Sequence, residues 1–387
     1  MPKDPAIQRA DILVIGAGIA GASVAAELSA AVSVVLLEME PVPGYHTTGR
    51  SAAVFAPTYG PAPIRALTRA SEAFYRDPPQ GFTADALLSP RDTLMIARSD
   101  QMTVFEAAHA EISGEASIVR LSGDDLRSRQ PLLKPGYAAA GFLDPTGSDI
   151  DVNALHQGYL RAFRAAGCRL VANARVTAMT QANDGWEVET TVGRFAATRI
   201  VNAAGAWADE IGALAGVENI GLVPKRRTAV LVGAPQGITV GDLPLTADIE
   251  ENFYLKPDSG RLLLSPADET PIPPCDVQPE ELDIAICIDR IETAFELNVR
   301  KIENKWAGLR SFVADKSPVV GYSDQADGFF WLAGQGGYGI QTAPALSRFA
   351  AALVLGRPVP RDILAKGLNP RDLSPSRLSD TLQDTNL

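Results

Sequence analysis

The stretch ILVIGAGIAGASVAAELSAAVSVVLLE, residues 12–38, constrains the fold of this chain more than any other. An apolar run typical of a buried strand leads into a turn with Gly16, Gly18 and Gly21, and an alanine-rich helical run follows. These glycines allow a tight turn, close approach of the backbone to a pyrophosphate, and close packing of helix against strand. A second apolar run ends on Glu38, where an acid accepts hydrogen bonds from a ribose. The sequence therefore predicts a Rossmann-like unit that binds a dinucleotide.

The composition is that of an ordinary folded protein. The chain has 387 residues, 46% of them hydrophobic and 21% charged, and its formal net charge is −11. This charge argues against nucleic acid as a partner, because nucleic acids bind basic surfaces. Three separated cysteines and only three histidines predict a reducing compartment and no metal site. No apolar run has the length of a transmembrane segment, so we expect a cytoplasmic protein.

Three later segments favour FAD over NAD as the dinucleotide. The loop EPVPGYHTTGRSAAVF (40–55) contains small residues that suit a backbone lying across a cofactor. In ATRIVNAAGAWADEIGALAGV (197–217), a strand leads through a small-residue corner into a helix. The same design returns in GFFWLAGQGGYGIQTAPALSRFAAALVLG (328–356), whose helix N-terminus would stabilise negative charge on a reduced flavin. This last turn, and the lack of a separate catalytic His or Lys constellation, disfavour an NAD-dependent dehydrogenase.

Six separated stretches give the chain a family resemblance: PGYHTTGRSAA, DPTGSDIDVNALHQGYLRAFR, PKRRTA, FYLKPDSG, WAGLRSFVAD and GGYGIQT. With these motifs it resembles the D-amino-acid oxidase superfamily of FAD-dependent oxidoreductases, and within it the bacterial D-arginine dehydrogenase branch. The resemblance implies an α/β fold, in which a Rossmann-like FAD-binding domain of the glutathione-reductase type carries a discontinuous α+β substrate-binding domain. We expect the FAD-binding domain to comprise 1–88, 147–218 and 307–387, and the substrate-binding domain 89–146 and 219–306.

The glycine motifs and the resemblance together predict the residues that contact FAD. We expect His46 to pack against the cofactor or hydrogen-bond to it, and not to transfer a proton. No cysteine is placed beside the flavin ring, so FAD is expected to be bound non-covalently. The predicted cofactor contacts are Gly16, Gly18, Ile19, Ala20, Gly21, Glu38, Met39, His46, Thr48, Gly49, Arg50, Ser51, Ala52, Ala53, Val176, Ala204, Gly205, Trp207, Arg310, Gly336, Gly337, Tyr338, Gly339, Ile340 and Gln341.

The resemblance also implies the residues that hold the substrate. Two arginines are expected to bind a carboxylate, because the planar guanidinium matches it bidentately. Two tyrosines are expected to place hydroxyls near it, and a glycine carbonyl to accept a hydrogen bond from the amine. The candidate catalytic residues are Arg227, Arg310, Tyr254, Tyr59, Gly337 and Gln341.

Two positions depart from the D-arginine dehydrogenase pattern. Val54 stands where that pattern has a histidine, and Thr93 where it has an acid. A guanidinium-bearing side chain favours a carboxylate partner, and the nearest one, Asp92, is one residue out of place. We expect Val54 and Thr93 to line the substrate pocket, which would then favour a neutral or apolar amino acid.

The activity that the resemblance implies is oxidative deamination of a D-amino acid. Hydride passes from Cα to flavin N5, and the imino acid is hydrolysed to the 2-oxo acid and ammonia. The sequence leaves the electron acceptor open between a quinone-like carrier and oxygen. It also leaves two alternatives open. One is oxidation of a secondary amine, such as an N-methyl amino acid or a D-proline derivative, and the other is a flavoprotein subunit that relays electrons.

Overall fold

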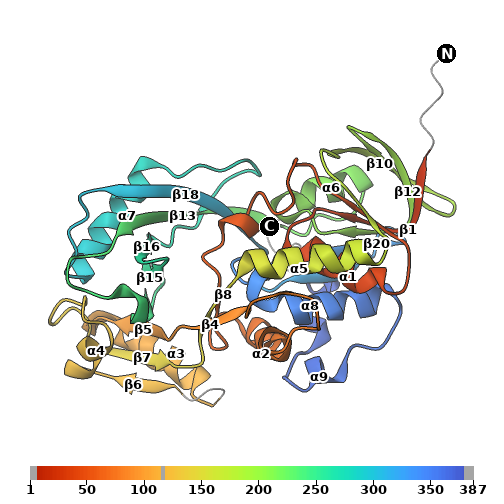
Figure 1. Cartoon of the computed structure of the whole chain (residues 1–387). Coiled ribbons are helices and arrows are strands. Elements are labelled where there is room, and N and C mark those ends of the chain that lie inside the picture. Colours follow the sequence, from red (N-terminus) through yellow and green to blue (C-terminus); the bar gives the residue numbers. More distant parts are fainter. Residues whose placement is uncertain (1–6, 115–117, 379–387) are drawn as a thin grey trace, which may run out of the picture.

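Two large sheets organise the chain, one in each of two lobes (Figure 1). The computed structural model describes residues 7–114 and 118–378. The eight-stranded sheet includes β20 (Phe329–Ala333) beside β12, and β19 (Val319–Tyr322) beside β20. The order of its other strands is β10 (Val176–Ala182), β11 (Gly185–Thr190), β12 (Gly193–Asn202), β1 (Gln8–Ile15), β2 (Val34–Leu37) and β9 (Arg169–Val171).

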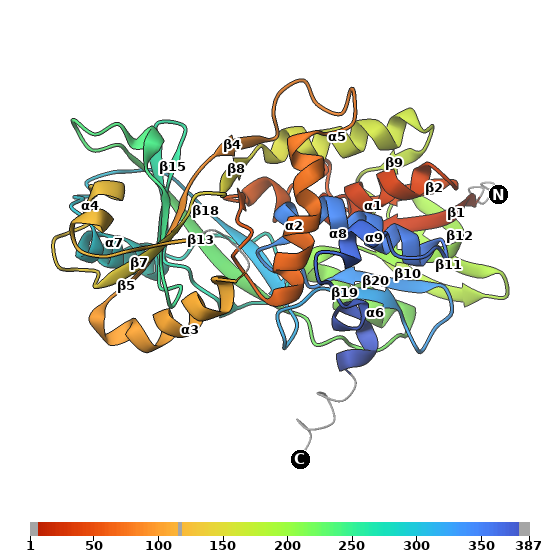
Figure 2. The ribbon, with the colours of Figure 1, turned by 90° about the horizontal axis from the view of Figure 1, so that it is seen from below.

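Both faces of this sheet are buried, which explains the uninterrupted apolar runs of β1 and β2. Along β1, Ile12 and Val14 join one core cluster, and Leu13 and Ile15 join a second cluster on the opposite face. The second cluster is covered by α6 (Ala208–Ala215). Four helices cover the first, with α9 (Arg361–Leu364) beside them (Figure 2): α1 (Ile19–Ser29), α2 (Ala62–Arg76), α5 (Val152–Ala165) and α8 (Gly339–Val354).

The parallel strands β1, β2, β12 and β20 bring four functional segments to one edge of the sheet. β1 pairs in parallel with β2 and β12, and the end of β12 pairs in parallel with β20. The glycine turn, Glu38, and segments 203–205 and 334–337 follow the carboxyl ends of these strands. Ligands of open α/β sheets bind at such an edge. The predicted α/β class with a Rossmann-like sheet is confirmed.

The second lobe contains a nine-stranded sheet. Its longest strands are β13 (Val223–Gly233) and β18 (Ile302–Phe312), which pair antiparallel and extend toward the first lobe (Figure 1). On one face of this sheet lie α4 (Asp124–Arg129) and α7 (Glu281–Ala294), and on the other face lies α3 (Met102–Ile112). After β13 the strands follow in the order β16 (Arg261–Ser265), β15 (Tyr254–Asp258), β14 (Leu245–Asp248), β5 (Thr93–Ala97), β7 (Ala140–Asp144) and β6 (Val119–Leu121), with β17 (Thr270–Pro271) also beside β13.

A small sheet connects the two lobes. It consists of β3 (Val54–Phe55), β8 (Ser148–Ile150) and β4 (Leu88–Pro90). Lys256 on β15 is buried, and its Nζ donates to the carbonyl oxygen of Ala52 at 2.9 Å and to Asp149 Oδ1 at 2.6 Å. This side chain therefore ties the loop before β3 to the nine-stranded sheet.

Two predicted domain boundaries fall inside strands. The boundary at residue 307 cuts β18, whose pairing with β13 runs from 302 to 312, so the whole strand belongs to the nine-stranded sheet. The boundary after residue 88 cuts β4, which pairs with β8 as one unit. The division into two domains otherwise stays a prediction. None of the helices in the described ranges combines the length and apolar character that crossing a bilayer requires.

Gly21→Ala tests the close packing at the first turn. A Cβ on Gly21 would lie 1.8 Å from the carbonyl oxygen of Gly16, so the turn or α1 must shift. We expect the free energy of unfolding to fall by about 1–3 kcal/mol and the flavin content to drop. Gly241→Ala is the control, because a Cβ there meets nothing within 4 Å. Unchanged denaturation midpoint and flavin content in Gly21→Ala would show that this packing is unimportant.

Candidate active site

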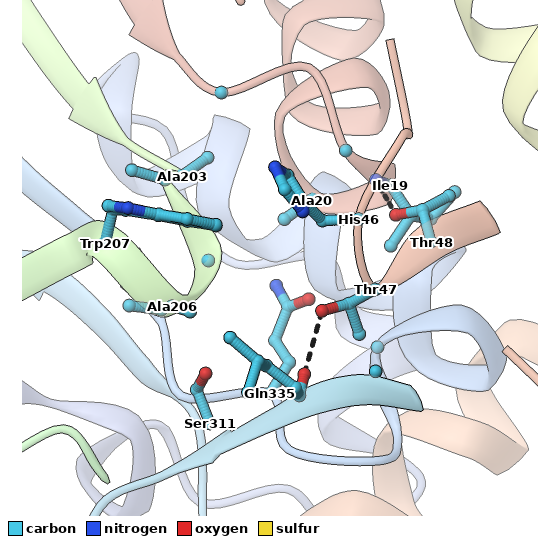
Figure 3. A pocket seen from close by; sticks show the side chains of 18 of the residues that line it. Ile19, Ala20, His46, Thr47, Thr48, Ala203, Ala206, Trp207, Ser311 and Gln335 are labelled. Carbon is cyan, nitrogen blue, oxygen red and sulfur yellow. Dashed lines mark hydrogen bonds between the residues drawn. The ribbon is translucent and has the colours of Figure 1, made fainter. Parts of the chain in front are cut away.

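A first cavity follows the carboxyl edge of the eight-stranded sheet (Figure 3). The glycine turn, the loop 39–52, the corner after β12 and the turn before α8 form its walls. These separated segments therefore meet at one site. The predicted cofactor contacts that line it are Gly16, Gly18, Ile19, Ala20, Glu38, Met39, His46, Thr48, Arg50, Ser51, Ala52, Val176, Ala204, Gly205, Trp207, Arg310, Gly336, Gly337, Gly339 and Ile340.

The glycine turn leaves the N-terminus of α1 open to this cavity. Gly16 has a φ of +98°, and a Cβ there would lie 2.5 Å from the carbonyl oxygen of Ala203. A Cβ on Gly18 would approach Thr48 Oγ1 to 3.2 Å, and this same oxygen accepts the N–H of Ile19 at 2.9 Å (Figure 3). A helix N-terminus that lines a cavity beside a glycine backbone is the arrangement that binds a pyrophosphate.

Glu38 lies at the carboxyl end of β2, beside the glycine turn. Its Oε2 accepts the N–H of Ala17 at 2.8 Å, and its Oε1 accepts the N–H of Glu40 at 2.9 Å. Burial raises the pKa of this carboxyl group, although both hydrogen bonds act in the opposite direction. The side chain is therefore held in the cavity wall, where a carboxylate can accept from ribose hydroxyls.

His46 and Trp207 project into the first cavity from opposite segments (Figure 3). Their ring centroids lie 4.7 Å apart, and His46 Nε2 lies 2.9 Å from Glu40 Oε1. The adjacent Thr47 donates its hydroxyl to the carbonyl oxygen of Leu309 at 2.8 Å, which ties this loop to β18. His46 is thus held by its neighbours, the arrangement expected of a residue that packs against the cofactor.

Arg50 lines the first cavity, and its guanidinium is already bonded to other residues of the protein. Its Nη1 donates to the carbonyl oxygens of Val277 at 3.0 Å and Ala307 at 3.1 Å, and its Nη2 forms an ion pair with Asp276. Trp306 Nε1 donates to the carbonyl oxygen of Arg50 at 3.1 Å. Arg50 therefore fixes the loop against β18.

A second cavity of about 450 Å³ adjoins the first. Ala53, Tyr338 and Gln341, which the sequence assigns to cofactor contact, line this second cavity and not the first. Gly21 and Gly49 line neither cavity; a Cβ on Gly49 would lie 2.8 Å from the carbonyl oxygen of Gly44, so Gly49 permits close packing of the loop. The residues common to both cavities are Ser51, Ala52, Arg227, Tyr254, Arg310 and Gly337.

Strand pairing places two arginines where the cavities meet. Arg227 on β13 is opposite Gly308 on β18, and Arg310 is opposite Lys225. Arg227 and Arg310 are therefore diagonal neighbours on one face of the sheet. A Cβ on Gly337 would lie 2.8 Å from Arg310 Cζ, so any other residue at 337 would displace the guanidinium from its place beside the turn before α8.

The adjacent Arg226 has a different environment. Its Nε donates to Asp283 Oδ2 at 2.9 Å, and it also forms an ion pair with Glu280. Alternation along β13 thus directs Arg226 to acidic partners and Arg227 to the cavities. Arg226 is structural, and the preference for Arg227 agrees with this geometry.

The positive charge at the junction has few partners. The guanidinium of Arg310 has no hydrogen-bond or ion-pair partner within residues 7–114 and 118–378. Burial lowers its pKa, but Tyr59, Tyr254 and Glu251 more than compensate and leave the pKa raised. For Arg227, burial and the nearby Arg310 lower the pKa; its Nη2 lies 3.2 Å from Glu269 Oε1, while its buried Nε has no partner in the described part of the chain. An anion at the junction would contact both guanidinium groups.

The far wall of the second cavity is apolar. Val54 and Thr93 line this cavity, whereas Asp92 is not among its described lining residues. That the cavity holds the substrate stays a prediction. Thr93 is buried on β5 and carries no charge. The apolar residues around them come from one face of the nine-stranded sheet and from α3, and are Met95, Ala108, Ile112, Phe142, Leu245, Ala247, Ile249 and Phe253. The ion pair of Arg65 and Glu111 also lines this cavity.

Several lining residues were missed from the sequence. Glu251 and Lys316 line the second cavity, and neither lies in a recognisable motif. Glu251 occupies the turn of a hairpin only three residues before Tyr254, so the neighbouring FYLKPDSG motif was the one available signal. In the first cavity the missed residues include Thr47, Ala203, Ala206, Ser311 and Gln335.

The sheet, the glycine turn and the two adjoining cavities define an FAD-dependent oxidoreductase. The sequence profile of the DAO family, described as FAD dependent oxidoreductase, matches residues 11–353, and the chain belongs to this family. The predicted superfamily and its cofactor FAD are therefore confirmed. In the described ranges, no three His, Cys, Asp or Glu side chains are grouped so that they could hold a metal ion.

The chain is similar to several characterised members. It is 29% identical over 254 residues to human mitochondrial dimethylglycine dehydrogenase, a match that covers 60% of this chain and 29% of that protein. It is 27% identical over 237 residues to glycine oxidase of Geobacillus kaustophilus, covering 60% of each chain. The chain thus spans less than two thirds of each relative. These relatives do not confirm the D-arginine dehydrogenase branch, which stays a prediction.

Solved structures show the same fold. Glycine oxidase from Geobacillus kaustophilus aligns with a TM-score of 0.79 at 23% identity, covering 91% of this chain and 96% of the other. L-α-glycerophosphate oxidase from Mycoplasma pneumoniae, solved with FAD bound, aligns with a TM-score of 0.80 at 20% identity, covering 90% and 95%. The first cavity, with its open helix N-terminus and anchored Glu38, fits FAD.

FAD is expected to be released when the protein is unfolded. None of the free cysteines Cys168, Cys275 and Cys287 lines the first cavity, and His46 already bonds to Glu40. Acid precipitation of the purified protein should therefore leave the yellow flavin in the supernatant. Flavin that stays with the washed pellet would show a covalent bond, and peptide mapping would then locate it.

Proposed function

We propose that this chain oxidises the carbon–nitrogen bond of an amino acid whose carboxylate is bound by Arg310 and Arg227. The observation that carries the proposal is the position of Arg310, a half-buried cation with no hydrogen-bond partner among the described residues, where the two cavities meet. A buried charge is costly unless it is paired, and a carboxylate offers a guanidinium both charge and bidentate geometry. Glycine oxidase and dimethylglycine dehydrogenase, to which the chain is similar, act on amino acids, as their names state.

The residues around the junction bind and orient the substrate. FAD, when bound, supplies the acceptor for the two electrons. Burial raises the pKa of Tyr59 to about 12, so its hydroxyl stays protonated and donates to Glu251. The ring of Tyr59 packs edge-on against Tyr338, with centroids 5.3 Å apart, which holds Tyr59 at the junction. The carbonyl oxygen of Gly337 accepts a hydrogen bond from the amine. The resulting imino acid reacts with water to give the 2-oxo acid and ammonia.

The apolar far wall supports a neutral or apolar side chain on the substrate. Burial of apolar surface there contributes about 25 cal/mol per Å². A cationic side chain would lose its hydration without gaining a carboxylate at Thr93. The D configuration of the substrate rests on the resemblance of the active-site motifs to D-amino acid dehydrogenases.

Oxidation of a secondary or tertiary amine is the second candidate. The similarity to dimethylglycine dehydrogenase favours it, and so does a cavity of about 450 Å³, which can hold substituents on the nitrogen as well as a side chain. An N-methyl amino acid would use the same arginine pair for its carboxylate. N-methyl amino acids therefore belong in any panel of substrates.

Arg310→Met should abolish turnover and leave the flavin in place. Removing the charge that binds a desolvated carboxylate should lower kcat/KM. The loss should correspond to about 3–5 kcal/mol of transition-state stabilisation. Steady-state kinetics and the flavin-to-protein ratio measure the two effects separately. Arg261→Met is the control, because Arg261 is an exposed residue on β16 that pairs with Glu303. A near-normal kcat/KM in Arg310→Met would refute the carboxylate role.

Neutral or apolar D-amino acids should have a higher kcat/KM than D-arginine and D-lysine. Thr93 offers no carboxylate to a cationic side chain, so such a substrate lacks a charge-assisted hydrogen bond of roughly 1.5–3 kcal/mol. Thr93→Glu should reduce or reverse the difference in kcat/KM between apolar and cationic D-amino acids, whereas Thr93→Val should leave this difference unchanged. Steady-state kinetics give kcat/KM for each of D-leucine, D-phenylalanine, D-proline and D-arginine. D-arginine as the best substrate of the unmodified enzyme would mean that Thr93 and Val54 do not set the specificity.

A further inference from the structure

We propose that Glu251 is the acceptor for the ammonium group of the substrate, so that the second cavity selects zwitterions over simple carboxylates. This inference rests on the proposed function, because it takes the substrate carboxylate to lie on Arg310 and Arg227. Those two arginines would bind any carboxylate, including the 2-oxo acid product. An unneutralised anion near them would favour ligands that also carry a positive charge.

Glu251 has the free negative charge that this role requires. The carboxylates lining the second cavity within the described ranges are Glu111 and Glu251. Glu111 is paired with Arg65 at 2.8 Å, whereas Glu251 pairs with the hydroxyl of Tyr59, a neutral donor. Glu251 also raises the pKa of Arg310, so its charge acts at the carboxylate-binding junction.

The turn that carries Glu251 is built to hold it there. Glu251 adopts a left-handed conformation with a φ of +57°, which is uncommon for a residue with a long side chain. Its N–H donates to the carbonyl oxygen of Asp248 at 2.9 Å. The buried side chain of Asp248 accepts from the N–H of Glu250 at 3.2 Å and from Asn252 Nδ2 at 2.8 Å, and Gln101 Nε2 donates to it at 2.9 Å. A turn fixed by a buried carboxylate presents Glu251 to the cavity in one position.

The neighbouring Glu250 offers a matched control. It lies in the same turn and accepts from Gln101 Nε2 at 2.9 Å, but it does not line the second cavity. Glu250→Gln and Glu251→Gln therefore remove the same charge from adjacent positions. Glutamine preserves the size of the side chain and its accepting oxygen.

The test measures binding, not turnover, with two isosteric ligands. 2-Aminoisobutyrate carries an ammonium and a carboxylate but no α-hydrogen, and in pivalate a methyl group replaces the ammonium. Each is titrated into the flavin-containing enzyme, and the perturbation of the flavin absorbance gives its Kd. In Glu251→Gln we expect 2-aminoisobutyrate to bind about tenfold more weakly and pivalate more tightly, as loss of one charge-assisted contact predicts. Glu250→Gln should leave both Kd values unchanged.

Three results would overturn the inference. They differ in whether the proposed carboxylate site is contradicted as well. Equal weakening of both ligands in Glu251→Gln would mean that the residue only supports the fold. Two unchanged Kd values in Glu251→Gln would mean that Glu251 does not contact the ammonium, while the carboxylate site stands. Binding of neither ligand to the unmodified enzyme would contradict the proposed function itself.

Discussion

The parallel pairing of β1 with β2 and β12, and of β12 with β20, is the constraint on which the site depends. It places the carboxyl ends of these strands at one edge of the sheet, and both faces of the sheet must be covered by other elements. The glycine turn and Glu38 can face the same cavity as segments 203–205 and 334–337 only because of this register. The FAD cavity is thus a direct consequence of sheet topology.

A second strand pairing positions the two arginines beside the cofactor cavity. β13 and β18 run antiparallel out of the nine-stranded sheet, and their register makes Arg227 and Arg310 diagonal neighbours. Lys256 and the small sheet that contains β3 hold the intervening loop against this lobe. The pair of strands β13 and β18 and the loop before β3 therefore meet at the junction between the cavities. Together they fix the positions of the two arginines relative to the cofactor site.

The fold could be predicted from the sequence wherever local chemistry specifies one conformation. Three spaced glycines between an apolar strand and a helix strongly favour a dinucleotide-binding turn. Alternation along a strand predicts different environments for Arg226 and Arg227, and in the structure Arg226 contacts acidic side chains while Arg227 lines the first cavity. The predicted boundary at residue 307 falls inside β18, because the side chain of Arg310 in the motif WAGLRSF lines the site while the backbone of the motif pairs with β13 in the nine-stranded sheet. Glu251 could not be found, because its position depends on a turn fixed by Asp248 and by Gln101, which is distant in sequence.

The central claim is that the flavin of this chain is reduced by an amino acid whose carboxylate lies on Arg310. Anaerobic addition of amino acids, followed by the visible flavin spectrum, tests it without any assumption about the electron acceptor. We predict that an apolar D-amino acid, added in excess, bleaches the oxidised-flavin band, and that its L enantiomer does so far more slowly. The account would be contradicted if no D-, L- or N-methyl amino acid bleached a flavin that dithionite reduces fully.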